Sequence, residues 1–382
     1  MKFSTLHSPF SIILLLICAS CQTEVPLSEP VKTSAKVYIV NNAEFGIHPD
    51  KTNAEATNAG INTAIRKAKE EGYEVVKFTK GDYLISADRI GDGLGYANQG
   101  GIQVPSFMTL DLTDATFHVK PNANTGYMLL RLNMVEDVTI IGGHLVGDRL
   151  EHDYETIQDT HEFGYGLVIS GSKNILIRDM TIEQMTGDAI AMGASHGGYD
   201  DRHRSRNVRI TNCEMAHNRR QGISIGHAWY VEIDSCYIHD IGITEDGIEG
   251  TDPGCGIDIE PSGESDWNEL ASYVNIHHNT IRHTLAEGLC IVNRWSTDID
   301  ASDNLFDDAG IVINRHPARI RLVRNTLNGW HSYMVALKGT IDVYMPMEGP
   351  NANIMEYPVR AGNSSTQTGY ITETDNYISP DE

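Results

Sequence analysis

Residues 207–234, NVRITNCEMAHNRRQGISIGHAWYVEID, contain one full unit of the repeat that decides the fold. The unit opens with Asn207-Val208-Arg209-Ile210 and closes with the similar Tyr230-Val231-Glu232-Ile233, which starts 23 residues later (230 − 207). Between them lies Gly222-Ile223-Ser224-Ile225. All three segments alternate apolar and other residues with the period of a β-strand, and no helical stripe competes with that pattern.

Both kinds of segment recur along most of the chain. The Gly/Ala-apolar-x-apolar kind occurs at Gly166–Ile169, Ala189–Met192, Gly222–Ile225, Gly256–Ile259, Gly288–Ile291 and Gly310–Ile313. The second kind occurs at Asn174–Ile177, Asn207–Ile210, Tyr230–Ile233, Tyr273–Ile276, Asp298–Ala301 and Arg319–Leu322. The closest starts of the second kind are 21 to 25 residues apart (319 − 298 and 298 − 273), and such a period is typical of a stacked β-solenoid.

The turn after each second segment carries a second signal. Six residues after the segment start stand Cys213 and Cys236, and later Asn279, Asn304 and Asn325. Stacked coils place equivalent residues directly above one another. We therefore expect the two cysteines to stack in the core. We also expect the three asparagines to form hydrogen bonds from coil to coil.

A helical segment and a strand precede the repeats. Asn53–Glu71 is rich in Ala, Lys and Glu, and it is followed by Val76-Lys77-Phe78-Thr79-Lys80-Gly81-Asp82-Tyr83. This arrangement resembles the opening of pectate-lyase-like proteins, in which a short helix caps the solenoid before a V-x-F-x-x-G-x-Y strand. The coils from residue 100 to about 340 fit the same superfamily. The resemblance implies an all-β fold, a right-handed parallel β-helix (solenoid) with an N-terminal capping helix.

The same resemblance implies a carbohydrate-active protein but does not indicate which reaction it catalyses. The fold hosts lyases, hydrolases, esterases, epimerases and phage adhesins. Members of this fold on lipoprotein tethers resemble the algal-polysaccharide enzymes of marine Bacteroidetes. Composition adds an exclusion: 29 Lys and Arg against 52 Asp and Glu make a net charge of −23, which excludes a globally basic nucleic-acid binder.

The N-terminus has the pattern of an export signal. Lys2 precedes the apolar run Phe10–Cys18, which is too short to span a bilayer, and Ala19-Ser20-Cys21 follows. A Cys in this setting resembles the lipobox of bacterial lipoproteins, although an ordinary cleaved signal remains an alternative. We expect a lipoprotein signal peptide at 1–20, lipidation of Cys21, a tether at 21–35 and one parallel β-helix domain at 36–382. The protein would then be anchored to the bacterial outer membrane, with the membrane touched only through this lipid anchor.

Arginine is the informative cation of the repeat region. No Lys occurs between Lys173 and Lys338, whereas Arg is frequent. A guanidinium grips a carboxylate or sulfate through two hydrogen bonds, while an ammonium acts as a point charge. We expect an anionic oligo- or polysaccharide as the partner. The predicted substrate-binding residues, all in or near the first-kind segments, are Arg219, Asn293, Arg294, Arg315 and Glu287.

These residues suggest β-elimination from a uronic acid. An Arg neutralises the substrate carboxylate, a base removes the proton beside it, and an acid protonates the leaving oxygen. The predicted catalytic residues are His227, Arg220, His196, Tyr199 and Lys338. Loss of a glycosidic oxygen would make a polysaccharide lyase, loss of a hydroxyl an oligosaccharide dehydratase, and reprotonation alone an epimerase. Candidate substrates are uronic-acid-containing algal glycans, sulfated ones included, such as ulvan or alginate.

Asp258 and Glu260 keep other functions open. They stand two positions apart, so both side chains face the same side of a strand. They could bind Ca²⁺, serve as the two carboxyl groups of a glycoside hydrolase, or pair with Arg220 or Arg294 in a surface ladder. No cofactor is required by the sequence. A non-catalytic glycan-binding lipoprotein is a further alternative.

The histidines invite a comparison with zinc sites. His277, His278 and His283 are close in sequence, but they have neither cysteine partners nor zinc-site spacing. We expect them to be solvent-facing or turn residues.

Overall fold

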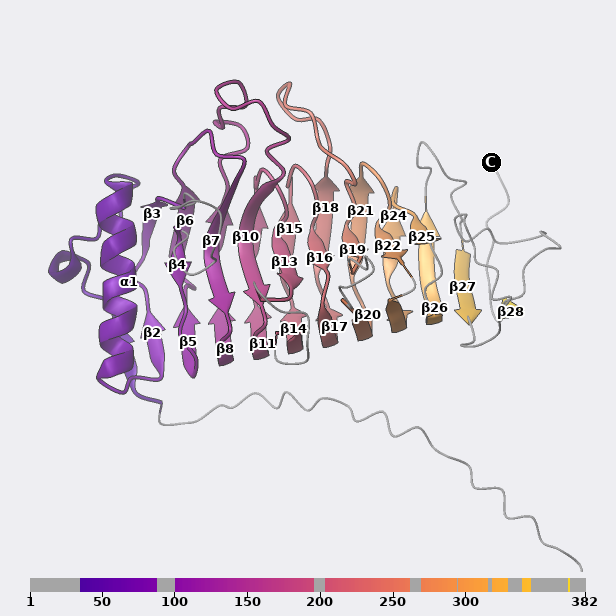
Figure 1. Cartoon of the computed structure of the whole chain (residues 1–382), viewed down its shortest axis with the longest axis horizontal. Coiled ribbons are helices and arrows are strands. Elements are labelled where there is room, and N and C mark those ends of the chain that lie inside the picture. Colours follow the sequence, from indigo (N-terminus) through magenta and orange to yellow (C-terminus); the bar gives the residue numbers. More distant parts are fainter. Residues whose placement is uncertain are drawn as a thin grey trace, which may run out of the picture.

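The computed structural model describes residues 35–87, 100–195, 203–261, 269–293, 295–314, 318–328, 339–344 and 370–371. They form stacked coils with a helix at one end, as Figure 1 shows from left to right. This architecture confirms the predicted all-β parallel β-helix. No helix among the described residues is both long enough and apolar enough to span a lipid bilayer.

Each coil contributes one strand to an eight-stranded sheet, which we call the front sheet. Its strands are β4 (Ile102–Gln103), β7 (Gly126–Asn133), β10 (Phe163–Ser170), β13 (Ile190–Gly193), β16 (Ile223–Ile225), β19 (Ile257–Ile259), β22 (Leu289–Val292) and β25 (Ile311–Asn314). Neighbouring strands pair in parallel without register shifts. The front sheet therefore contains the Gly/Ala-apolar-x-apolar segments of the sequence repeat.

Two further strands of most coils belong to a second sheet of twenty strands, counted over the described residues. The first column of this sheet contains β1 (Val37–Ile39), β2 (Val75–Lys77), β5 (Met108–Asp111), β8 (Glu136–Ile141), β11 (Lys173–Arg178), β14 (Ser205–Thr211), β17 (Ala228–Asp234), β20 (Ala271–His277), β23 (Ser296–Ser302) and β26 (Ala318–Asn328). The second column contains β3 (Gly81–Ile85), β6 (Ala115–Val119), β9 (His144–Val146), β12 (Thr181–Glu183), β15 (Glu214–Ala216), β18 (Tyr237–Ile241), β21 (Thr280–Thr284) and β24 (Leu305–Asp307).

Within the repeated coils, the strands of the second column are a feature that the sequence did not predict. β12 is Thr181-Ile182-Glu183, with one buried residue between two half-buried ones. A segment with a single inward apolar residue is too short for a period-2 pattern to emerge. The parallel order ends at β27 (Gly339–Tyr344), which pairs antiparallel with β26 and with β28 (Tyr370–Ile371).

The chain bends between strands at residues with left-handed backbone conformation. Asn207 near the start of β14 and Asn212 directly after it have φ of 54° and 52°, and His217 follows β15 with φ of 55°. Asn and Asp tolerate this conformation better than other residues with a side chain. Equivalent residues of successive coils occupy the same corner, so each corner forms a column of side chains along the solenoid.

The core runs continuously through the coils as ladders of Ile, Val and Leu. Cys213 and Cys236 are buried in it, as predicted. The asparagine column is also confirmed: Asn279 Nδ2 donates to Asn304 Oδ1 at 3.0 Å, and Asn304 Nδ2 donates to Asn325 Oδ1 at 2.9 Å. These bonds satisfy amide groups that would otherwise be costly to bury.

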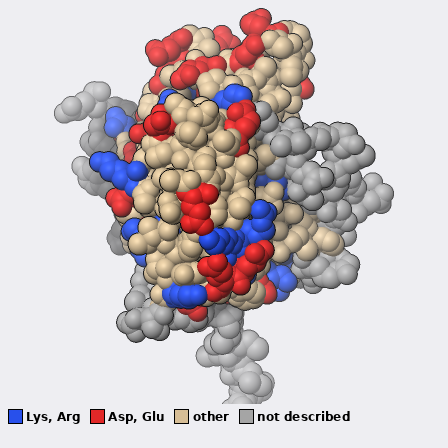
Figure 2. Space-filling model, turned by 90° about the vertical axis from the view of Figure 1, so that its left-hand side faces the viewer, with Lys and Arg blue, Asp and Glu red and all other residues tan. Residues whose placement is uncertain are grey.

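Helix α1 (Ala54–Glu70) closes the first coil and confirms the predicted capping helix. It follows the short 3₁₀ helix η1 (Asn42–Phe45) and buries Ile61, Ala64 and Ile65 against the solenoid. Covering the end in this way keeps the edge of the core from water. The face at this end carries acidic and basic side chains intermixed, so its surface has no single sign of charge (Figure 2).

Candidate active site

A cleft of about 850 Å³ runs over the outer face of the front sheet. It collects residues from strands β7 to β19 and from the loops near them, which are far apart in sequence but adjacent in the stack. Its polar lining includes Arg220, Ser224, Asp258, Glu260 and Asn293. We call this set of residues and the space over it the cleft.

Asp258 lies at the centre of the cleft floor. It is the middle residue of β19, paired in register with Ser224 on one side and Cys290 on the other. Only 4% of Asp258 is exposed, and its Oδ2 accepts a hydrogen bond from Gln221 Nε2 at 2.6 Å. Burial, assisted by the negative charge of Glu260, raises the pKa of Asp258 to about 7. Asp258 is therefore a carboxylic acid that holds its proton close to neutral pH.

A second carboxyl group, Asp188, lies beneath the cleft and orients two of its residues. Arg220 Nη1 donates to Asp188 Oδ1 at 3.2 Å and Oδ2 at 3.3 Å, and Ser224 Oγ donates to Oδ2 at 2.7 Å. Burial raises the pKa of Asp188, while Arg220 and Ser224 oppose that rise. Because Asp188 is fully enclosed, its role is to fix the Arg220 guanidinium at the cleft wall.

Four of the residues predicted from the sequence come together here. Arg220 and Asp258 lie as described, and Glu260 is exposed at the end of β19, on the same side of the chain as Asp258. Asn293 lines the cleft and donates through Nδ2 to the carbonyl of Pro261 at 3.0 Å. These four residues bring two carboxyl groups, a guanidinium and an amide to the cleft.

Three other predicted residues lie elsewhere. His227 is fully buried, and its Nδ1 accepts the backbone N–H of Leu270 at 2.9 Å, so it does not line the cleft. Arg219 donates to the carbonyls of Glu249 and Thr160 and ties loops together. Glu287 lies one coil further along, where Cys290 Sγ approaches its Oε2 at 3.6 Å, and it is also outside the cleft lining.

The remaining predicted residues fall outside the described part of the chain. They are Cys21, His196, Tyr199, Arg294, Arg315 and Lys338. Their predicted roles stay predictions.

The sequence reasoning missed four residues of this site: Asp188, Ser224, Glu269 and Trp295, of which the last three line the cleft. A signal for Asp188 existed. It precedes β13 at the position that Gln221 holds before β16, as the backbone bond from Ala189 N to the Gln221 carbonyl shows. Reading that column across the aligned coils would have found it. Glu269 follows a stretch outside the described residues, and no repeat position marks it.

Comparison with known proteins places this architecture in a family. Residues 133–342 match the family model described as "Right handed beta helix region". Uncharacterized protein YclG of Bacillus subtilis (strain 168) is 32% identical over 310 residues, or 80% of this chain and 49% of that protein. The SPbeta prophage-derived uncharacterized protein YorA of the same strain is 33% identical over 242 residues, or 60% of this chain and 39% of that protein. The chain thus spans half or less of the length of these relatives.

Solved structures share the fold at low sequence identity. The Dettilon tailspike protein has a TM-score of 0.53 at 13% identity, with 77% of this chain and 50% of that chain covered. An iota-carrageenase complexed to iota-carrageenan fragments has a TM-score of 0.50 at 13% identity, with 73% and 57% covered. These similarities concern the fold. Together with the family-model match over more than half of its length, they show that the chain belongs to the right-handed β-helix family.

Proposed function

We propose that this protein is a carbohydrate-active enzyme that cleaves a glycosidic bond, with Asp258 as the general acid. The observation that carries this proposal is a carboxyl group with a pKa of about 7 in the floor of an open cleft. A general acid works best when its pKa lies near the working pH, because it is then protonated and still able to give up its proton. Leaving-group oxygens of sugars need such a donor.

Hydrolysis is the reaction that the described residues support best. Glycoside hydrolases pair a protonated carboxyl group with an ionised one on the same substrate. Asp258 and Glu260 form such a pair, since the charge of Glu260 is itself one reason why Asp258 keeps its proton. In this proposal Glu260 activates water or attacks the sugar, while Gln221 holds Asp258 in place through their 2.6 Å hydrogen bond.

An anionic polysaccharide is the proposed substrate class. Arg220 offers its guanidinium at the cleft wall, and Trp295 adds an aromatic surface on which a sugar ring can stack. Arg grips carboxylate or sulfate groups through two hydrogen bonds. The iota-carrageenase of the same fold was solved in complex with iota-carrageenan fragments, which supports a polysaccharide as the substrate class. Uronate-containing and sulfated glycans such as alginate and ulvan are therefore the first substrates to test.

Elimination from a uronic acid is the second candidate, and Arg220 is the observation in its favour. Its guanidinium could neutralise the substrate carboxylate while Asp258 protonates the leaving oxygen. The base would come from His196 or Tyr199, whose positions lie outside the described residues. A lyase, a dehydratase and an epimerase would share this arrangement.

One experiment separates these reactions. The protein and its Asp258→Asn variant are incubated with a panel of uronate-containing, sulfated and neutral glycans, and the reducing ends, ultraviolet absorbance and product masses are recorded. Hydrolysis gives new reducing ends and the mass of one added water per cut. The appearance of ultraviolet absorbance from an unsaturated product would show that the reaction is elimination and would reject the hydrolysis proposal. Binding of a glycan that stays chemically unchanged would reject the enzyme proposal and favour the glycan-binding alternative.

A further inference from the structure

A second cluster of ionisable side chains lies on the other sheet, away from the cleft. His217 directly follows β15, while Asp240 and His283 lie near the ends of β18 and β21 at the equivalent corner, each with a left-handed backbone (φ of 55°, 53° and 50°). The parallel register pairs Ala216 with His239, so the corner column continues with Asp240 directly beyond His217. We call His217, His239, Asp240 and His283 the corner cluster; none of them lines the cleft.

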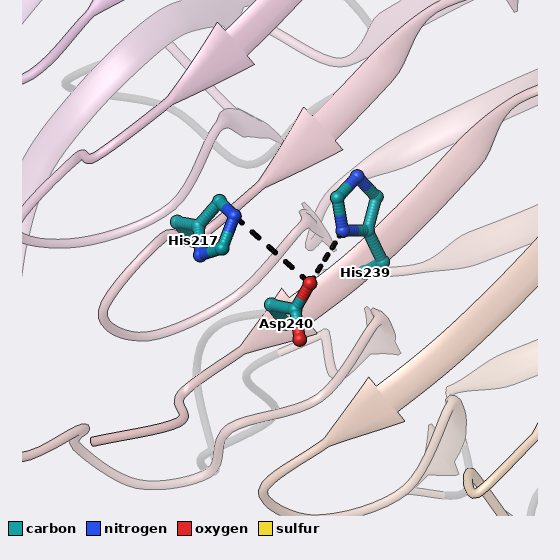
Figure 3. Close-up of side chains that lie close together, drawn as sticks. All are labelled: His217, His239 and Asp240. Atoms are coloured by element: carbon teal, nitrogen blue, oxygen red, sulfur yellow. Dashed lines mark hydrogen bonds and ion pairs between the residues drawn. The ribbon is translucent and has the colours of Figure 1, made fainter. Parts of the chain in front are cut away.

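The imidazoles of the corner cluster converge on one carboxylate. His239 Nδ1 lies 2.6 Å from Asp240 Oδ2, and His283 Nδ1 lies 2.5 Å from Asp240 Oδ1. His217 Nε2 lies 4.0 Å from Asp240 Oδ2, as Figure 3 shows together with the His239 contact. One ligand atom from each of His217, His239 and Asp240 fits within a span of 4.8 Å. Imidazole nitrogens and carboxylate oxygens are ligands that Zn²⁺ accepts.

A further shell of carboxylates orients two of these histidines. His217 Nδ1 lies 3.2 Å from Glu245 Oε2, and His239 Nε2 lies 3.1 Å from Glu214 Oε1. Metal-binding histidines commonly donate their other ring N–H to a carboxylate, which leaves the lone pair of the first nitrogen facing the metal. Tyr237 stacks on the His239 ring, with centroids 4.1 Å apart, and so restrains its rotation.

We infer that the corner cluster is a binding site for a divalent transition ion of the Zn²⁺ class. A lone pair on His239 Nδ1 and one on Asp240 Oδ2 repel each other unless a cation, either a proton or a metal ion, lies between them. His217, His239 and Asp240 supply three ligand atoms, and the backing acids increase the basicity of the two imidazoles. The side chains of His217 and Asp240 are 36% and 30% exposed, so an ion can enter from solvent. His283 was expected from the sequence to be a solvent-facing or turn residue; it lies within β21 with a side chain that is 46% exposed, and its contact with Asp240 Oδ1 helps to orient that carboxylate.

The test is a calorimetric titration of the chelator-treated full chain with Zn²⁺, in a buffer free of competing ligands. We expect saturable binding of one ion per chain. Asp240→Asn and His217→Gln should weaken it at least tenfold, and Glu214→Gln, which changes only the backing acid, by about 10–100-fold. Co²⁺ should give the visible absorbance of a nitrogen- and oxygen-ligated ion in the wild type and lose it in Asp240→Asn.

The matched control is His277→Gln. His277 Nε2 also faces a single carboxylate, Glu232 Oε1, at 3.2 Å, but it is outside the corner cluster, so its replacement should leave Zn²⁺ affinity unchanged. Circular dichroism melts without metal identify variants that fold poorly; His283→Gln, at a side chain that is 46% exposed, then serves as the replacement test. Absence of saturable binding by the wild type, or equal affinity in the His217, Asp240 and His277 variants, would overturn the inference.

Discussion

Two aspartates of neighbouring coils, Asp258 and Asp240, have pKa values that are shifted in opposite directions. Asp258 lies in the cleft floor, where burial and then the charge of Glu260 raise its pKa to about 7. Asp240 lies at a corner of the other sheet. Burial acts in the same direction there, but hydrogen bonds from His239 and His283 outweigh it and lower the pKa of Asp240. One carboxyl group is thus kept as an acid and the other as an anion.

The difference shows how the repeated coils of a solenoid can give the same residue type different chemical properties. Each coil supplies one residue to every column, and the column neighbours decide what that residue does. Asp258 has Ser224 and Cys290 as its register neighbours, which bring no positive charge. Asp240 has imidazoles on both sides. The same residue type becomes a proton donor in one column and a cation ligand in the other.

The largest expected effect is on catalysis. Asp258→Asn removes the general acid and should lower kcat by about 10²–10⁴-fold on the substrate identified by the glycan panel. Asp240→Asn should leave kcat within about twofold, because the corner cluster does not line the cleft. Steady-state rates of both variants, with circular dichroism as the check of folding, measure this contrast. A comparable loss in Asp240→Asn would show that the two regions are coupled.

The Asp258→Asn and Asp240→Asn substitutions should change the pH dependence of protein stability in opposite directions. Unfolded Asp258 ionises near its ordinary value of 3.8, whereas the folded group stays protonated to about 7, so it destabilises the fold increasingly between these pH values. Asp258→Asn should therefore stabilise the protein at pH 8 relative to pH 4, by up to roughly 4 kcal/mol at 1.36 kcal/mol per tenfold change.

The effect of Asp240 on the free energy of unfolding has the opposite dependence on pH. Its lowered pKa stabilises the fold above the unfolded value, and that contribution is lost as the pH falls through the folded value. Asp240→Asn should destabilise at pH 7 by about 1 kcal/mol or less, since solvent screens the partly exposed pairs, and have no effect at pH 2. Urea unfolding of both variants across this pH range gives the answer. If the free energy of unfolding changed with pH in the same way in both variants, the predicted difference between Asp258 and Asp240 would be wrong.

Substitutions of the adjacent Arg220 and Arg219 test whether the position of an arginine relative to the cleft decides its role in substrate binding. Arg220→Lys keeps a positive charge beside Asp188 but loses the two-pronged grip, so KM for an anionic glycan should rise roughly tenfold. Arg219→Lys should leave KM unchanged, because Arg219 donates to backbone carbonyls of loops outside the cleft. A comparison of KM for anionic and neutral glycans separates the two. Equal effects of the two changes would remove Arg220 from the proposed site.

The smallest expected effect is a displacement of the pH profile. Gln221 Nε2 donates to Asp258 Oδ2 at 2.6 Å and favours the ionised carboxylate. Gln221→Met removes this donor, so the pKa of Asp258 should rise and the alkaline limb of kcat/KM should move to higher pH by about one unit. A movement to lower pH, or none, would show that Asp258 is not the group that controls this limb.

Much of the site was accessible from the sequence, and the reason is the strand period. Asp258 and Glu260 stand two residues apart, so a single strand had to present both on one face. Arg220 precedes the aligned segment that contains Ser224, which brought it to the same edge. His227 was predicted to be catalytic, but β16 ends at Ile225 and the His227 side chain is fully buried, away from the cleft. The end of a strand depends on contacts that no local pattern reports.

By itself, the sequence determined the repeat, the inward ladders, the asparagine column and the capping helix. Each of these follows from a local period or from identical positions in successive coils. Only the tertiary structure decided which carboxyl group is desolvated, that Asp188 holds Arg220, and that His217, His239 and His283 meet at Asp240. Burial and electrostatic neighbours are properties of three-dimensional packing, since loops of unequal length set which side chains of different coils converge.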